Sequence, residues 1–155
     1  MKLKIFTVLI TLFCVAAVSF ADDIDRRVIN QLKALDMSYT IDDDGDFKII
    51  CDTENGRSQI VWVISETESY QGAEIREIFS FGYDGYIGES LMSYMLKESN
   101  GNKMGAWGIH DDADLAVFTV RVPADCDEDT LYAAIWMAAY VADELEDDFA
   151  GVDEW

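Results

Sequence analysis

The fold is decided by residues 115–149, which read LAVFTVRVPADCDEDTLYAAIWMAAYVADELEDDF. Residues 115–122 are rich in the β-branched and aromatic side chains that favour strands, and Pro123 ends this run because proline cannot donate to a sheet ladder. Asp127 has the chemistry of a helix N-cap. Residues 131–142 contain no charged side chain, and a helix that is apolar all round is buried on more than one side. We therefore predict a central strand followed by a long, largely buried helix.

The predicted helix carries two rows of apolar side chains. The first row can cover a sheet and comprises Leu131, Ile135, Ala138, Ala142, Leu145 and Phe149. The second, offset row comprises Tyr132, Trp136 and Tyr140, and we name it the aromatic stripe. Two interpretations stay open for this stripe. Either it belongs to the core and packs on the sheet with Trp62 and Phe118, or it forms a homodimer or peptide-binding surface, since aromatic side chains anchor many interfaces.

Helical and alternating patterns divide the chain upstream of this stretch. Apolar residues recur at helical spacing in residues 22–36 and 86–98, which predicts two amphipathic helices. Strands are predicted at residues 39–41, 47–51, 59–65, 73–81 and 103–110, with a hairpin turn at Asn55-Gly56. The apolar run 60–64 is expected to be buried on both faces. The chain is therefore predicted to form one α+β domain, residues 22–149, in which helices pack on an antiparallel sheet, followed by a frayed acidic tail at residues 150–155.

The first 21 residues have the three parts of a secretory signal peptide. Lys2 and Lys4 precede an uncharged apolar run, and Ser19 and Ala21 supply small residues before a cleavage site at Asp22. The alternative is a retained membrane anchor, but the apolar run is short for a span of ~20 residues. We expect the mature protein to be periplasmic or secreted, with no membrane association after cleavage.

An exported chain can form disulfides, and cleavage leaves Cys51 and Cys126. A bond between them would close a long loop and contribute ~4 kcal/mol in the chain-entropy model. Two buried free thiols are the alternative, and the sequence leaves both open.

The charge of the chain narrows the classes of partner. Acidic residues number 31 and basic residues 11, which gives a net charge of −20. Nucleic-acid binding needs clustered Lys and Arg, and docking on anionic lipid needs basic segments, so we expect neither. We expect a protein or peptide partner or a homodimer, and the acidic charge could steer a basic partner.

The sequence shows no catalytic constellation, so we assign no catalytic residue, no metal ligand and no cofactor. The single histidine, His110, lacks the further N or S ligands of a zinc site. The acidic turn at residues 42–46 fails the EF-hand spacing in both registers tested. A second acidic turn contains Asp111, Asp112 and Asp114, and weak calcium binding stays open at either turn. A hydrolase with a carboxylate pair also stays open, because 31 acids always offer pairs.

Residues 24–149 resemble the YbjN-like family of bacterial sensory transduction regulators. The resemblance is carried by patterns of apolar positions and turns at residues 97–100 (KESN), 122–123 (VP), 128–131 (EDTL), 57–63 (RSQIVWV) and 73–78 (AEIREI). It implies the type III secretion chaperone-like fold, with the order α-β-β-β-α-β-β-α. Chaperones of this fold are small, acidic and commonly dimeric, and they bind segments of client proteins.

Secretion chaperones act in the cytosol, whereas this chain has a predicted signal peptide. The resemblance therefore implies the fold rather than a secretion-chaperone role. Our leading hypothesis is a non-enzymatic exported protein of YbjN-like type that binds a protein or peptide and forms a dimer. The alternative is a small acidic ligand- or calcium-binding periplasmic module.

Overall fold

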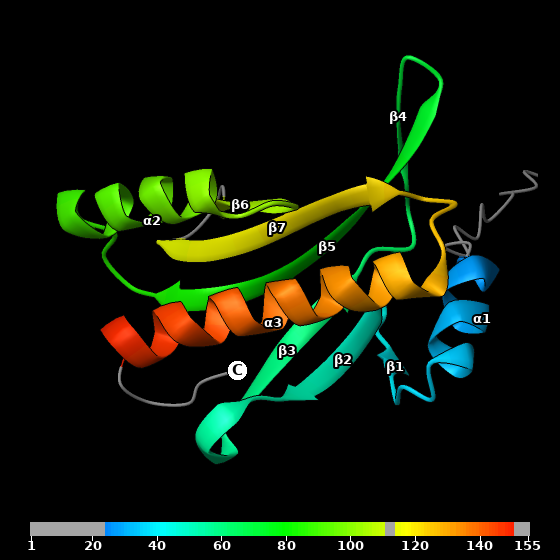
Figure 1. The fold of residues 1–155 in the computed structure, drawn as a ribbon, viewed down its shortest axis with the longest axis horizontal. Coiled ribbons are helices and arrows are strands. Elements are labelled where there is room, and N and C mark those ends of the chain that lie inside the picture. Colours follow the sequence, from blue (N-terminus) through cyan, green and yellow to red (C-terminus); the bar gives the residue numbers. More distant parts are fainter. Residues whose placement is uncertain (1–23, 111–113, 151–155) are drawn as a thin grey trace, which may run out of the picture.

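Seven strands form one antiparallel sheet in the computed structural model, which describes residues 24–110 and 114–150 (Figure 1). The strand order is β1-β2-β3-β5-β7-β6, and β4 pairs with β5 outside this path. The strand bounds are Thr40–Ile41 (β1), Phe47–Asp52 (β2), Ser58–Val63 (β3), Glu68–Tyr70 (β4), Ala73–Asp84 (β5), Gly105–Ile109 (β6) and Leu115–Pro123 (β7). The predicted signal peptide, residues 1–21, lies outside the described residues, as do Asp111, Asp112 and most of the predicted tail.

Three α-helices within residues 24–110 and 114–150 accompany the sheet, so the described part of the chain is α+β as predicted. They are α1 (Arg26–Ala34), α2 (Glu89–Gly101) and α3 (Glu128–Phe149). Figure 1 shows α3 running along the sheet with α1 near its first turns. Helix α3 contacts β3, β5 and β7, whereas α2 lies against β6. The buried residues of α2, Leu91 and Met95, cluster with Ala116 of β7 and Leu145 of α3, which places α2 on the same side of the sheet as α3.

The long helix forms where the sequence predicts it. The Asp127 carboxylate caps it by accepting a hydrogen bond from the Thr130 backbone N–H at 2.9 Å. Buried side chains then recur through all its turns, from Leu131 to Glu146. The predicted central strand is also confirmed as β7, which lies between β5 and β6.

The hairpin between β2 and β3 is confirmed as well. Asn55 and Gly56 both have positive φ angles, 60° and 78°, and lie in the short 3₁₀ turn η1 (Glu54–Gly56). The two flanking strands pair antiparallel from Phe47–Val63 to Asp52–Ser58. Asparagine and glycine tolerate this left-handed backbone at low cost, so the local sequence sets the register of the hairpin.

The strand count differs from the order implied by the family resemblance. That order has three strands before the second helix, whereas the structure has five, because the short strands β1 and β4 are added. Strand β4 forms because Gln71 and Gly72, both at positive φ, reverse the chain and pair Glu68–Tyr70 with the start of β5. The resulting hairpin extends beyond the rest of the sheet (Figure 1).

Two buried ion clusters attach helices to strands. Arg76 of β5 is 1% exposed, and it donates to the Asp25 carboxylate before α1 and to the Ile64 carbonyl. Arg57, at the start of β3, donates to Asp143 and to Glu146 of α3, at 2.7 Å each. Removing one partner of a buried ion pair costs several kcal/mol, so these clusters hold α1 and the end of α3 against the sheet.

Candidate binding surface

One face of the sheet is covered by helices, and the other is not covered by any helix of residues 24–110 and 114–150. Burial alternates along every long strand: in β3, Gln59, Val61 and Val63 are buried, whereas Ile60 and Trp62 are partly exposed. The buried set belongs to the core that includes α1 and α3. We name the opposite side the open face. It contains Lys48, Ile50, Ile60, Trp62, Ile64, Ile75, Glu77, Phe79, Phe81, Val117, Thr119 and Arg121, which share one side by register.

Aromatic rings gather at the centre of the open face. Trp62 of β3 lies directly across from Phe79 of β5, with ring centroids 5.4 Å apart and planes 11° from parallel. Phe81 contacts both rings, at 5.3 Å from Trp62 and 5.2 Å from Phe79. Lys48 Nζ lies 5.7 Å from the Trp62 ring, and Ile50 beside it is 66% exposed. The open face is therefore an apolar patch with an aromatic centre.

The structure corrects one expectation of the sequence analysis about this face. The run 60–64 was expected to be buried on both faces, and the structure buries only one. The same finding removes Trp62 from the core interpretation of the aromatic stripe, because Trp62 lies on the side of the sheet away from α3 whereas Phe118 lies toward it.

Strand β5 inverts the usual placement of polar and apolar side chains. Its polar residues Arg76 and Ser80 point toward the helices and are buried, whereas Phe79 and Phe81 point to the open face. The buried polar groups are satisfied: Arg76 pairs with Asp25, and Ser80 Oγ donates to the Ile60 carbonyl at 2.6 Å. The inversion costs the core little because these hydrogen bonds exist, and it leaves the aromatic rings at the surface.

An acidic hollow of about 240 Å³ lies at one end of the open face. Its lining comprises Ile64, Glu66, Glu68, Ile75, Glu77 and Arg121. Arg121 donates to Glu77 at 2.6 Å, so one of the three carboxylates is paired. Within residues 24–110 and 114–150, no basic side chain lies within salt-bridge distance of Glu66 or Glu68.

The aromatic stripe of α3 forms a second surface on the helix side. Tyr132 and Tyr140 are 43% and 48% exposed, and Trp136 between them packs partly against the core. Their rings follow one another along the helix, with centroids 6.0 Å and 5.2 Å apart. The structure thus brings the three predicted residues together, with their outer edges accessible.

Cys51 and Cys126 are free thiols in the structure, which is one of the two alternatives that the sequence leaves open. Cys51 lies in β2 opposite Gln59, close to the strand end where Arg57 reaches Asp143. Cys126 precedes the first turn of α3, and its carbonyl accepts a hydrogen bond from Gln31 of α1.

The residues considered for metal or acid–base chemistry are dispersed or occupied. The His110 ring contacts Phe81 at 6.1 Å, at the margin of the open face. The Asp42 carboxylate accepts hydrogen bonds from the backbone N–H groups of Asp44 and Asp46, which shapes the turn. Among the described residues, no three His, Cys, Asp or Glu side chains are grouped so that they could hold a metal ion.

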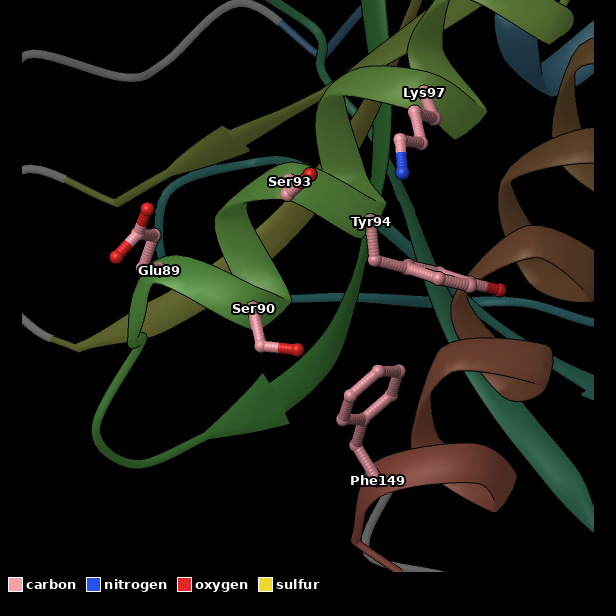
Figure 2. A pocket seen from close by; sticks show the side chains of 6 residues that line it. All are labelled: Glu89, Ser90, Ser93, Tyr94, Lys97 and Phe149. Atoms are coloured by element: carbon pink, nitrogen blue, oxygen red, sulfur yellow. The ribbon is translucent and has the colours of Figure 1, made fainter.

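A wide hollow of about 550 Å³ lies between α2 and the end of α3. Figure 2 shows the Phe149 ring of α3 beside the Tyr94 ring of α2, and the two rings are in edge-to-face contact with centroids 5.2 Å apart. Burial raises the pKa of the Tyr94 phenol, and nearby acidic residues raise it further. Ser90 and Ser93 also line this hollow, but the single histidine of the chain is not among its lining residues, so neither serine has a histidine base there.

No family model, curated protein or solved structure matches this chain. Membership of the YbjN-like family therefore stays a prediction from the residues. Among the helices in the described part of the chain, none is long and apolar enough to cross a bilayer.

Proposed function

We propose that this chain is a non-enzymatic exported protein of YbjN-like type, with a chaperone-like fold, that binds another polypeptide through the open face of its sheet. The observation that carries the proposal is the aromatic cluster of Trp62, Phe79 and Phe81 on a face without a covering helix. Sheets bury their apolar face against another layer, and exposed apolar patches with aromatic centres are typical of binding surfaces.

The inversion in β5 supports the same proposal. Burying Phe79 and exposing Ser80 would be the simpler arrangement for a soluble sheet, yet the chain hydrogen-bonds Ser80 inside and leaves Phe79 outside. Departures from local rules that bring no gain to the core are expected at functional sites. The predicted signal peptide supports an encounter with the partner outside the cytosol.

A peptide array tests the proposal, with Thr119→Glu as the perturbation. Thr119 lies opposite Phe79 at the centre of the open face, so a carboxylate there disturbs the surface and not the core. We expect the wild-type protein to bind a subset of apolar-rich peptides and the variant to lose them. Ser93→Glu on the exposed side of α2 is the matched control. Equal binding by wild-type protein and Thr119→Glu would contradict the proposal.

A homodimer formed through the aromatic stripe is a second proposal, favoured by the exposed edges of Tyr132 and Tyr140. Light scattering on wild-type protein and Trp136→Asp distinguishes the outcomes. A wild-type dimer that becomes a folded monomer supports the interface. A wild-type monomer that unfolds on substitution assigns the stripe to the core.

Calcium binding is the alternative function. The carboxylate of Asp42 is used by its own turn, which weighs against a site there. Isothermal titration decides: no heat at millimolar calcium removes this alternative.

A further inference from the structure

We propose that the occupant of the open face is a basic amphipathic helix of a partner protein. Its apolar side chains would pack on Trp62 and Phe79, and one lysine or arginine would enter the acidic hollow beside Glu66 and Glu68. This inference rests on the proposed function and specifies the chemistry of the partner.

Charge complementarity selects a basic partner. The hollow contains three glutamates and one arginine, and Arg121 is already paired with Glu77. Glu66 and Glu68 are exposed, and the described residues provide no cation within salt-bridge distance of either carboxylate. A chain with a net charge of −20 also attracts a basic segment over long range, which accelerates the encounter.

The walls of the hollow suit a long cationic side chain. Ile64 and Ile75 line it together with the carboxylates, so the alkyl part of a lysine or arginine would contact apolar atoms while its charged end reaches Glu66 or Glu68. The neighbouring cluster already holds a cation, because Lys48 Nζ lies 5.7 Å from the Trp62 ring. The face therefore combines an aromatic platform with a site for a positive charge.

The layer geometry favours a helix over an added strand. On the opposite side of the sheet, α3 crosses β3, β5 and β7, and a helix on the open face would cover the same strands from the other side. The outer edge of β6 is partly occupied, because the Trp107 backbone N–H donates to Ser99 Oγ of α2 at 2.8 Å. A second copy is disfavoured, because a two-fold contact through this face would bring together two surfaces with the same acidic hollow.

The test uses three synthetic helical peptides of ~18 residues, about five turns, with the same leucine face. The flanking positions are lysine in the first peptide, glutamine in the second and glutamate in the third. Affinity is measured by isothermal titration with the full-length protein and with Glu66→Gln/Glu68→Gln. The matched control is Glu89→Gln/Glu144→Gln, which removes the same charge from exposed positions of α2 and α3.

We expect the lysine peptide to bind most tightly, and the Glu66→Gln/Glu68→Gln variant to bind it about tenfold more weakly, since a close charge pair is lost. The control pair is expected to change affinity much less. Equal weakening by both pairs, or equal affinity for the lysine and glutamine peptides, would overturn the basic partner. In that case the proposed function survives if Thr119→Glu still abolishes binding.

Failure of the proposed function has a different signature. If no peptide binds, or if Thr119→Glu leaves peptide binding unchanged, the open face is not a polypeptide-binding surface. If the protein is a dimer that Thr119→Glu dissociates, the occupant is a second copy, and the inference of a basic partner is wrong.

Discussion

Replacing one phenylalanine on each face of the sheet tests whether the open face is uncovered in solution. Phe118 of β7 is fully buried on the helix side, whereas Phe79 of β5 is partly exposed on the open face. The substitutions Phe118→Ala and Phe79→Ala remove the same atoms from interior positions of neighbouring strands. The change in strand propensity is therefore similar, and the difference between them reports burial.

The magnitudes follow from the contacts of each ring. Truncating a fully buried phenylalanine costs about 3–5 kcal/mol. Phe79 loses its stack on Trp62, and an aromatic pair contributes ~0.5–1.5 kcal/mol, together with a part of its burial. We expect Phe79→Ala to cost about 1.5 kcal/mol, and the two variants to differ by about 1.5–3.5 kcal/mol in the free energy of unfolding.

Urea unfolding followed by circular dichroism provides the measurement. With a slope of about 2 kcal/mol per molar urea, the midpoints of the two variants should differ by roughly 0.7–1.8 M. Equal losses for Phe79→Ala and Phe118→Ala would refute the reasoning, because Phe79 would then be as buried as the core. Repeating the comparison at high protein concentration identifies the cause, since a covering second copy makes the cost of Phe79→Ala concentration-dependent.

Two further predictions concern the buried ion cluster and the thiols. Asp25→Ala is expected to lower the free energy of unfolding in urea by about 4 kcal/mol, because it removes the cap of α1 and leaves the buried Arg76 without its carboxylate. The control Asp127→Ala removes a helix cap alone and should lower it by about 1 kcal/mol. Burial raises the pKa of Asp25, but hydrogen bonds from its two arginine partners outweigh this effect and lower the pKa to about 2. The stabilisation by the Asp25 carboxylate is therefore complete above about pH 4 and is lost as the pH falls through 2. Unfolding measured at a series of pH values checks this expectation. Burial raises the pKa of the Cys51 thiol to about 12. Alkylation of the folded protein at mildly alkaline pH should therefore label the less buried Cys126 first, which mass spectrometry of the labelled peptides reads out. A disulfide between the two cysteines would block labelling of both.

Local signals explain why some elements could be predicted from the sequence. The N-cap Asp127, the apolar helix after it and the hairpin at Asn55-Gly56 each depend on residues that are neighbours in the chain. The aromatic stripe follows from the same helical periodicity, so its three members could be grouped before the structure was known. Strand β4 was missed because its three residues are all exposed and carry no apolar pattern.

The open face could not be predicted from the sequence. Alternation of side chains along a strand assigns them to two faces, but it does not say which face a helix layer covers. In β5 the polarity itself misleads: Arg76 and Ser80 are polar and buried, whereas Phe79 is apolar and partly exposed. The partners that settle the matter, Asp25 for Arg76 and Gln59 for Ser80, lie far away in the sequence. One sequence signal for the open face was available: the aromatic residues Phe79 and Phe81 alternate along β5, and Trp62 lies in a neighbouring predicted strand.

The acid excess of the chain has a physical connection to the aromatic cluster on its open face. A partly exposed cluster of three aromatic rings promotes self-association, and the acidic hollow at its margin together with a net charge of −20 opposes it by repulsion between copies. Under the proposal of a basic partner, the same charges would attract that partner, so one arrangement would both oppose self-association of the free protein and select what binds. Under the same proposal, Glu66 and Glu68 lie where their charge would discriminate between partners that the apolar cluster alone would accept equally.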